Sequence, residues 1–307
     1  MDVCVTSDGF FYIPNSAAID EIVAKVREGI YCTVLGPRYC QKSMLLSDIE
    51  TRLEATGDEF CFLLDLEGLR TEPDSQFLGS FASQVEENMQ GLGGISFPLS
   101  SGKVTDGLSL RRFLEECVTQ LRGDLVLLID HLERIRIGPL KSLLTALRSL
   151  HDAQGQDDPY RLVVVIATSL SVAELSLGPT SPFNIAHPVL IQDLTREQSE
   201  RLIRQILEQK EIELTASGHR RCIEAIGGDR YLIPTLCHQC AQITAGKGRG
   251  EAAPHDVDEA IVWFLDVQAD QYPPLQETIR ALEASPAALI DVLKILEEGA
   301  VLGRDLQ

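Results

Sequence analysis

The sequence predicts an α/β fold: a three-layer αβα core built on a parallel sheet, followed by an all-helical domain. Two observations lead to this prediction. Before residue 170, helical patterns alternate with four short apolar segments, at residues 30–35, 60–66, 125–129 and 162–167. Strands that are apolar on both faces are typical of a parallel sheet covered by helices on both sides. After about residue 188 the strand-like segments cease and helical patterns follow.

Helical patterns and turn signals separate the four predicted strands. The first strand runs directly into Gly36 and then into SMLLSDIETRLEA, in which apolar residues recur at helical spacing. A helical pair follows the second strand and is interrupted by a glycine-rich stretch at 90–107, which we expect to be a surface loop. Residues 140–151 predict the helix before the fourth strand. Ligands collect at the carboxyl ends of such strands, which here carry residues 36–43, Asp65, Asp130 and Thr168.

The second half of the chain predicts helices joined by short turns. Thr195 and Gln198 have the spacing of a capping box, in which each side chain caps the backbone of the other residue. Helices are expected up to about 211, at 215–226, 231–245 and 255–270, and finally at 287–296. The expected domains are a core at 1–188, a helical domain at 189–250 and a C-terminal helical segment at 251–307.

The composition, 44% hydrophobic and 24% charged, is that of an ordinary globular protein. No apolar run approaches the roughly 18–20 residues that cross a bilayer, and the N-terminus lacks the features of a secretory signal. We therefore expect a cytoplasmic protein without a membrane partner. With 27 Lys and Arg against 46 Asp and Glu, the net charge is −19. This balance disfavours nucleic acid, whose phosphates are bound by basic residues, and favours protein partners and small anions.

Eight cysteines are scattered through mostly apolar segments, as expected of reduced and buried thiols. Cys237 and Cys240 have C-x-x-C spacing on a predicted helix. Because no second pair lies at zinc-finger distance, the pattern favours packing in the core over metal binding or redox chemistry.

Residues 36–43, GPRYCQKS, lie between a predicted strand and a predicted helix and match most of the phosphate-binding pattern G-x-x-x-x-G-K-[ST]. In that pattern backbone N–H groups and the helix N-terminus hold phosphate, the lysine reaches the terminal phosphates and the hydroxyl ligates Mg²⁺. The alternative is an ordinary strand-to-helix turn that contains a lysine. The candidate nucleotide-binding residues are Gly36, Pro37, Arg38, Cys40, Gln41, Lys42, Ser43 and Met44, with Ser43 also a candidate metal ligand.

The second glycine of the pattern is replaced by Gln41. Glycine lets the backbone approach phosphate, and a side chain at a left-handed position costs roughly 1–2 kcal/mol. Gln41 therefore either weakens phosphate binding or adds a contact through its amide.

Further candidates follow the later strands and a lid helix. Asp130 ends a buried strand, where such a carboxylate holds Mg²⁺, or else it caps the next helix. His131 and Glu133 are candidates for activating water, although His131 is equally a polar residue at a loop edge. Thr168 either orients water near a terminal phosphate or forms a turn. Arg230 opens a later helix and either contacts phosphate or lies on the surface.

Together these motifs resemble the AAA-like ATPase domain of bacterial signalling proteins, close to the STAND NTPases and to the AAA+ ATPases of origin-recognition type. The resemblance covers roughly residues 1–285 and rests on FFYIP at 10–14, VLGPRYCQKSMLL at 34–46, LLIDHLERI at 127–135, SPFNIAHPVLIQDLTREQ at 181–198 and GGDRYLIPTLC at 227–237. It implies a P-loop NTPase core, a helical lid and the start of a winged-helix unit. It also implies that ATP or ADP with Mg²⁺ lies between core and lid, and that nucleotide state is coupled to oligomerisation or to release of an effector.

The departures from the family pattern concern the chemistry. Gln41 replaces the loop glycine, and His131 replaces the glutamate expected to activate water. Both the Walker A and the Walker B motif are therefore degenerate. We expect a nucleotide-binding switch or assembly module with weak or absent hydrolysis. The alternatives are a slow ATPase and a pseudo-ATPase scaffold that works without nucleotide.

Overall fold

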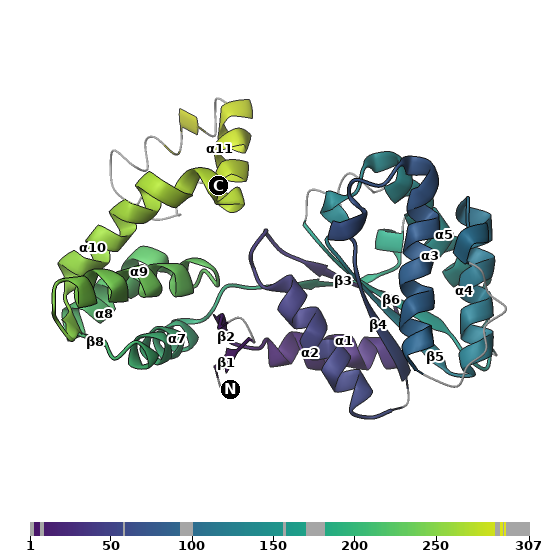
Figure 1. Cartoon of the computed structure of the whole chain (residues 1–307), viewed down its shortest axis with the longest axis horizontal. Coiled ribbons are helices and arrows are strands. Elements are labelled where there is room, and N and C mark those ends of the chain that lie inside the picture. Colours follow the sequence, from purple (N-terminus) through teal and green to yellow (C-terminus); the bar gives the residue numbers. More distant parts are fainter. Residues whose placement is uncertain are drawn as a thin grey trace, which may run out of the picture. The chain divides into compact units, whose positions relative to one another are not determined.

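The computed structural model describes residues 3–6, 9–57, 59–92, 101–155, 158–169, 182–285, 289–290 and 292. The chain forms two compact units, Met1–Leu194 and Thr195–Gln307 (Figure 1). Each unit is treated below by itself.

The first unit is built on a five-stranded parallel sheet with the order β4-β5-β6-β3-β7. The four strands predicted from the sequence are present, and a fifth was missed because HPVL is short and contains Pro188. Proline cannot donate to a strand ladder, but it is tolerated at a sheet edge, where β7 lies. The strands are β3 (Cys32–Leu35), β4 (Glu59–Asp65), β5 (Asp124–Asp130), β6 (Leu162–Thr168) and β7 (His187–Leu190).

Helices cover both faces of this sheet, which confirms the predicted three-layer core (Figure 1). On one face lie α1 (Ser16–Arg27) and α2 (Lys42–Glu54); on the other lie α3 (Asp74–Gly91), α4 (Gly107–Leu121) and α5 (Ile137–Ala153). The apolar residues of β5 and β6 are at most 1% exposed, as their continuous apolar sequence requires. A two-residue antiparallel pair, β1 (Cys4–Val5) and β2 (Phe11–Tyr12), precedes α1. Within the predicted glycine-rich loop, the described part contains a short 3₁₀ turn at Ser101–Lys103.

The second unit is helical, with one two-residue parallel pair formed by β8 (Glu213–Leu214) and β9 (Glu251–Ala252). Its first helix begins with the predicted capping box: Thr195 Oγ1 accepts from Gln198 N at 3.3 Å, and Gln198 Oε1 accepts from Thr195 N at 2.9 Å. The predicted helix at 287–296, with the winged-helix start, lies almost entirely outside the described residues. The described helices are α7 (Arg196–Gln209), α8 (Ala216–Ile226), α9 (Leu232–Gly246), α10 (Pro254–Trp263), which continues as a π-helical turn at Phe264–Gln268, and α11 (Pro273–Ala284).

Seven of the eight cysteines are buried, and Cys4 is half-buried. All eight are free thiols, and Cys237 and Cys240 are buried on α9 beside Cys222. Burial raises the pKa of Cys240 to about 12, which makes the thiolate scarce at neutral pH. Across the described ranges no three His, Cys, Asp or Glu side chains are grouped to hold a metal ion. Cys237 and Cys240 thus both contribute to the buried side of α9.

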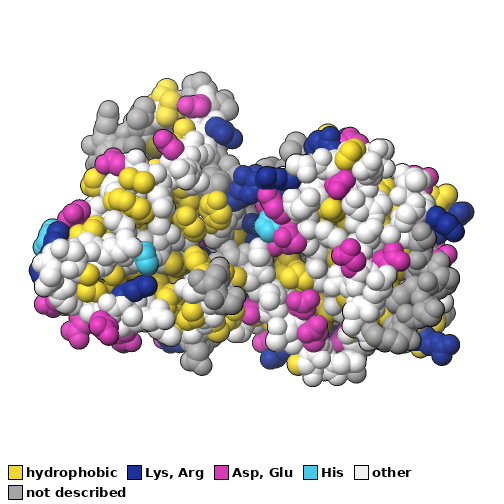
Figure 2. Space-filling model, viewed as in Figure 1, with side chains coloured by type: hydrophobic (Ala, Val, Ile, Leu, Met, Phe, Trp, Pro, Cys, Tyr) yellow, Lys and Arg dark blue, Asp and Glu magenta, His cyan; other side chains and the backbone are white. Residues whose placement is uncertain are grey.

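Charged side chains are dispersed over the surface. In Figure 2 acidic groups are spread over the visible face of the first unit rather than gathered in one patch, while hydrophobic side chains reach the visible face of the second unit. Among the described helices none is both long and apolar enough to cross a membrane.

Candidate functional site

The loop between β3 and α2 lies at the carboxyl edge of the sheet, where the strand order reverses. The chain places β3 between β6 and β7, whereas the next strand in sequence, β4, forms the far edge. Leu35 pairs in register with Thr168 on β6 and with Leu190 on β7. Gly36 N then donates to Thr168 O at 3.4 Å, which ties the loop to the end of β6. Ligands of open α/β sheets bind at such reversal points.

Two residues of the loop adopt left-handed backbone conformations. Tyr39 has φ 65° and Gln41 has φ 69° and ψ 33°, next to the first residue of α2. This region favours glycine, since a Cβ there crowds the carbonyl oxygen. Gln41 therefore occupies the conformation for which the phosphate-binding pattern uses its second glycine.

The loop folds around the ammonium group of Lys42, which is only 7% exposed. Lys42 Nζ donates to Gly36 O at 3.1 Å and to Pro37 O at 2.6 Å, and lies 3.9 Å from Cys40 Sγ. Gly36 leaves room for that thiol: a Cβ on Gly36 would lie 2.5 Å from Cys40 Sγ. The loop thus holds one buried positive charge near its centre.

The N-terminus of α2 adds a second source of positive potential. The first N–H groups of a helix, here from Lys42, Ser43 and Met44, have no partner within the helix and attract anions. The Ser43 side chain is exposed, Met44 is half-buried, and Pro37 and Arg38 are exposed and half-buried respectively. The lysine and the helix terminus thus bring two sources of positive potential together at this loop.

The ends of β4 and β5 bring two carboxylates and an imidazole together. Asp65 and Asp130 are direct neighbours in the strand register. His131, with φ 57°, donates its backbone N–H to Asp130 Oδ1 at 2.8 Å, and its Nδ1 lies 2.8 Å from Asp65 Oδ1. Burial alone would lower the pKa of His131, but the charges of Asp130 and Asp65 and the hydrogen bond to Asp65 raise it. Asp130 is 5% exposed, and the backbone N–H of His131 holds its carboxylate in place.

Sequence reasoning noted Asp65 as a strand end but did not include it among the site residues. The signal was present: FLLDL and LLID end in aspartate at the same register position on adjacent parallel strands. What the sequence does not show is that His131 turns back and bridges the two carboxylates.

Two other candidate residues carry buried polar atoms without hydrogen-bond partners in the described part of the chain, Thr168 Oγ1 and Glu133 Oε2. A buried polar atom left unsatisfied costs about 1–3 kcal/mol, so such atoms are normally met by water or a ligand. Arg230 belongs to the second unit and is 6% exposed. Its neighbour Asp229 opens α9, as predicted, by accepting from Tyr231 N at 2.8 Å and Leu232 N at 2.7 Å.

Solved structures share this fold. A Walker-type ATPase of Pyrococcus abyssi matches with a TM-score of 0.62 at 17% identity, over 92% of this chain and 79% of that one. The ORC2 protein of Aeropyrum pernix, solved in ADPNP–ADP complexes, matches with 0.53 at 15% identity, over 82% and 69%. The ORC1 protein of the same organism, solved with DNA, matches with 0.51 at 16% identity, over 81% and 65%. At these identities the likeness establishes the fold, a P-loop NTPase core, and no more.

A comparison with curated proteins finds no match. A family model described as an AAA-like domain matches residues 1–245, which include the loop, the strand ends and most of the helical unit. The chain therefore belongs to the AAA-like domain family, whose P-loop fold makes it a nucleotide-binding type of module.

Proposed function

We propose that this protein binds ATP or ADP at residues 36–43 and uses the nucleotide as a switch, with weak or absent hydrolysis. One observation carries the proposal: the loop keeps the ammonium of Lys42 buried beside the N-terminus of α2, where it adds to the anion-binding potential of the helix. In phosphate-binding loops the backbone N–H groups share the negative charge, so this single lysine would suffice for a polyphosphate.

The same site fits Mg²⁺ only together with phosphate. Ser43 and Asp130 would supply a hydroxyl and a carboxylate oxygen, the donor types that Mg²⁺ prefers. Mg²⁺ bound in this way would take its other ligands from phosphate and water. When bound, Mg²⁺ would neutralise phosphate charge.

Weak hydrolysis follows from the residues beside Asp130. The position after it carries His131, whose Nδ1 lies 2.8 Å from Asp65 Oδ1. Burial would lower the pKa of this ring, but the charges of Asp130 and Asp65 raise it, so a larger share of the imidazole is already protonated near neutral pH and cannot take a proton. Glu133 Oε2 is buried in the 3₁₀ turn Leu132–Arg134, so this carboxylate does not lie freely at the sheet edge. We infer that the protein holds nucleotide more readily than it consumes it. A slow ATPase would require the neutral form of His131 to take a proton at Nε2, or Glu133 to rearrange.

One observation favours a second candidate, a scaffold that works without nucleotide. Two carbonyl oxygens of the loop already satisfy the Lys42 ammonium, and Cys40 Sγ packs against Gly36. A phosphate must therefore compete with the loop's own acceptors for the lysine.

Titration calorimetry with ADP and ATP, with and without Mg²⁺, separates these functions. The switch predicts binding that Lys42→Ala weakens at least tenfold, about 1.4 kcal/mol, and that Lys141→Ala, an exposed lysine on α5, leaves unchanged. Phosphate release that disappears in Lys42→Ala would identify a slow ATPase. Absence of binding at millimolar nucleotide would refute the proposal and favour the scaffold.

We further propose that nucleotide state is coupled to self-association or to a protein partner. The second unit exposes large apolar side chains on and after α10, among them Val262, Leu265 and Val267, each more than half exposed. Exposed apolar groups that lie together mark interaction surfaces. Sedimentation with and without ADP tests this: Leu265→Glu should abolish any association, and a monomer under all conditions would refute self-association. Nucleic acid is not part of the proposal, given the net charge of −19.

A further inference from the structure

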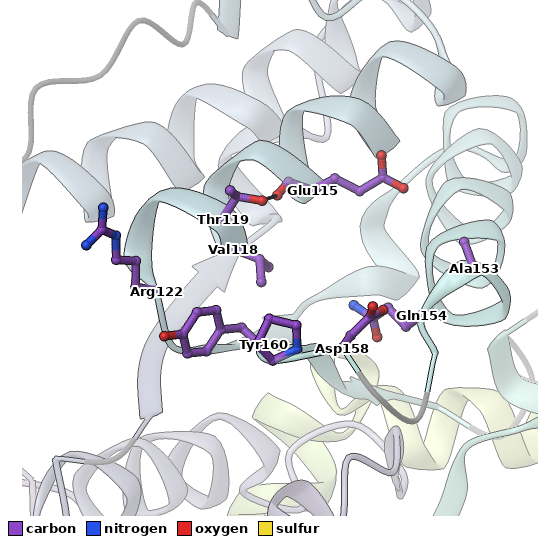
Figure 3. A pocket seen from close by; sticks show the side chains of 9 residues that line it. Glu115, Val118, Thr119, Arg122, Ala153, Gln154, Asp158 and Tyr160 are labelled. Carbon is purple, nitrogen blue, oxygen red and sulfur yellow. Dashed lines mark hydrogen bonds between the residues drawn. The ribbon is translucent and has the colours of Figure 1, made fainter.

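A pocket lies at the amino ends of the strands, opposite the carboxyl ends that carry the loop at 36–43. It occupies about 530 Å³ between the C-terminal turns of α4 and α5 and the segment that leads into β6. Val118 of α4, Ala153 of α5 and Pro159 line its apolar part, together with the ring of Tyr160 (Figure 3). This volume is within the range of about 300–1,000 Å³ that is typical of small-molecule sites.

Most polar groups in this pocket are already engaged by the protein. Thr119 Oγ1 donates to Glu115 O at 2.8 Å, and Glu115 Oε1 accepts from Arg111 Nε at 2.7 Å. Asp158 Oδ2 accepts from Gly155 N at 2.7 Å. Each of the two carboxylates still has a second oxygen that can accept.

The guanidinium of Arg122 and the hydroxyl of Tyr160 differ from these groups. In the described ranges the side chain of neither residue makes a hydrogen bond or an ion pair. Arg122 ends α4 with φ 52°, a conformation that an arginine adopts only at a cost in backbone strain. The next residue is Gly123, which would hold this conformation without strain. Arg122 thus contributes a guanidinium that lines the pocket and that no hydrogen bond or ion pair engages in the described part of the chain.

The charges are separated across the pocket. In Figure 3 the guanidinium of Arg122 and the hydroxyl of Tyr160 lie toward one end, and the carboxylates of Glu115 and Asp158 lie toward the other. The apolar side chain of Val118 lies between them. A ligand that complements this arrangement carries a carboxylate, an apolar body and an ammonium group, in that order.

We propose that this pocket binds a small zwitterionic molecule of the short-peptide class. Arg122 would bind its carboxylate through paired N–H donors, the geometry that guanidinium groups favour. The free oxygens of Glu115 and Asp158 would accept from its ammonium, and Val118 and Tyr160 would contact its side chains. The pocket shares no residue with the loop at 36–43. The proposal therefore does not depend on nucleotide binding.

Calorimetry on the full chain tests the proposal with L-leucyl-L-leucine as probe. The free dipeptide should bind, whereas N-acetyl-L-leucyl-L-leucine, which lacks the ammonium, and L-leucyl-L-leucinamide, which lacks the carboxylate, should bind at least about tenfold more weakly. Equal binding of all three, or no binding of the free dipeptide at millimolar concentration, would overturn it.

Matched variants locate the site. Arg122→Ala should weaken the free dipeptide about tenfold or more, and Arg122→Lys less so because the charge remains. Arg112→Ala, an exposed arginine of the same helix outside the pocket, should have no effect. Glu115→Gln should act on the ammonium alone, so it should weaken the free dipeptide and leave the N-acetyl derivative unchanged, with Glu116→Gln as its control. Binding that Arg122→Ala leaves at the wild-type level would contradict the assignment.

Discussion

Replacing Gln41 with glycine should stabilise the first unit, because this residue has a left-handed backbone conformation, with φ 69°. A left-handed conformation costs a residue with a Cβ roughly 1–2 kcal/mol. Glycine removes that cost but gives the unfolded chain more freedom, which offsets about 0.4–1 kcal/mol. The difference between these ranges gives an expected net gain in the free energy of unfolding of about 0–1.6 kcal/mol. For a unit of this size that corresponds to a rise in Tm of up to about 6 °C.

Thermal unfolding of three variants isolates the backbone contribution. Gln41→Ala removes the contacts of the side chain but keeps the Cβ, so the difference between the glycine and alanine variants reports the left-handed conformation alone. Ser47→Gly, at an exposed position inside α2 with helical backbone angles, should instead lower stability by a few tenths of a kcal/mol to about 1 kcal/mol.

Nucleotide affinity provides the stricter test of the same reasoning. The left-handed backbone conformation belongs to the folded loop, so its cost is a cost of folding and cancels in binding. Gln41→Gly and Gln41→Ala should therefore strengthen ADP binding by the same factor, because both remove the glutamine side chain from the loop. The reasoning is refuted if glycine is less stable than alanine at position 41, or if glycine strengthens binding and alanine does not.

Three further predictions concern packing and charge. Gly36→Ala places a Cβ 2.5 Å from Cys40 Sγ and should destabilise the first unit by about 1–3 kcal/mol in urea unfolding; adding Cys40→Ala should restore most of the loss, and no rescue would contradict the contact. The pKa of His131 is raised in the folded protein, so its charged form stabilises the fold. This contribution is complete below the ordinary histidine pKa of about 6.5, and it is lost as pH rises through the raised pKa of the folded state. Asp65→Asn should lower the pKa of His131 in an NMR titration, and an unchanged pKa would show that Asp65 does not bridge it in solution. Burial would raise the pKa of Asp256, but hydrogen bonds from the Ala253 N–H, Lys247 and Arg249 hold it at about 2. Asp256→Asn should therefore cost about 3 kcal/mol at neutral pH, and the difference from wild type should vanish as pH falls from about 4 toward 2; a difference independent of pH would refute the charge argument.

Much of the site could be predicted because its signals are local. Gly36, Lys42 and Ser43 lie within one turn between a strand and a helix, so their spacing alone places them at the same loop. Asp130 closes a run of apolar residues and must reach the sheet edge when that run is buried. The partnership of Asp65 with His131 joins residues 66 positions apart, and a single sequence holds no signal for that distance.

The sequence by itself determined the three-layer core, the positions of the loop at 36–43 and of Asp130 after their strands, and the helical second unit. These features could be predicted because apolar periodicity and capping act over a few residues. Only the tertiary structure decided that β7 completes the sheet beside β3, since a four-residue edge strand with Pro188 carries almost no pattern of its own. It also decided that Gln41 takes the left-handed conformation and that Lys42 is held by the carbonyls of its own loop. Those features depend on where α2 is anchored against the sheet, which is a property of packing rather than of local sequence.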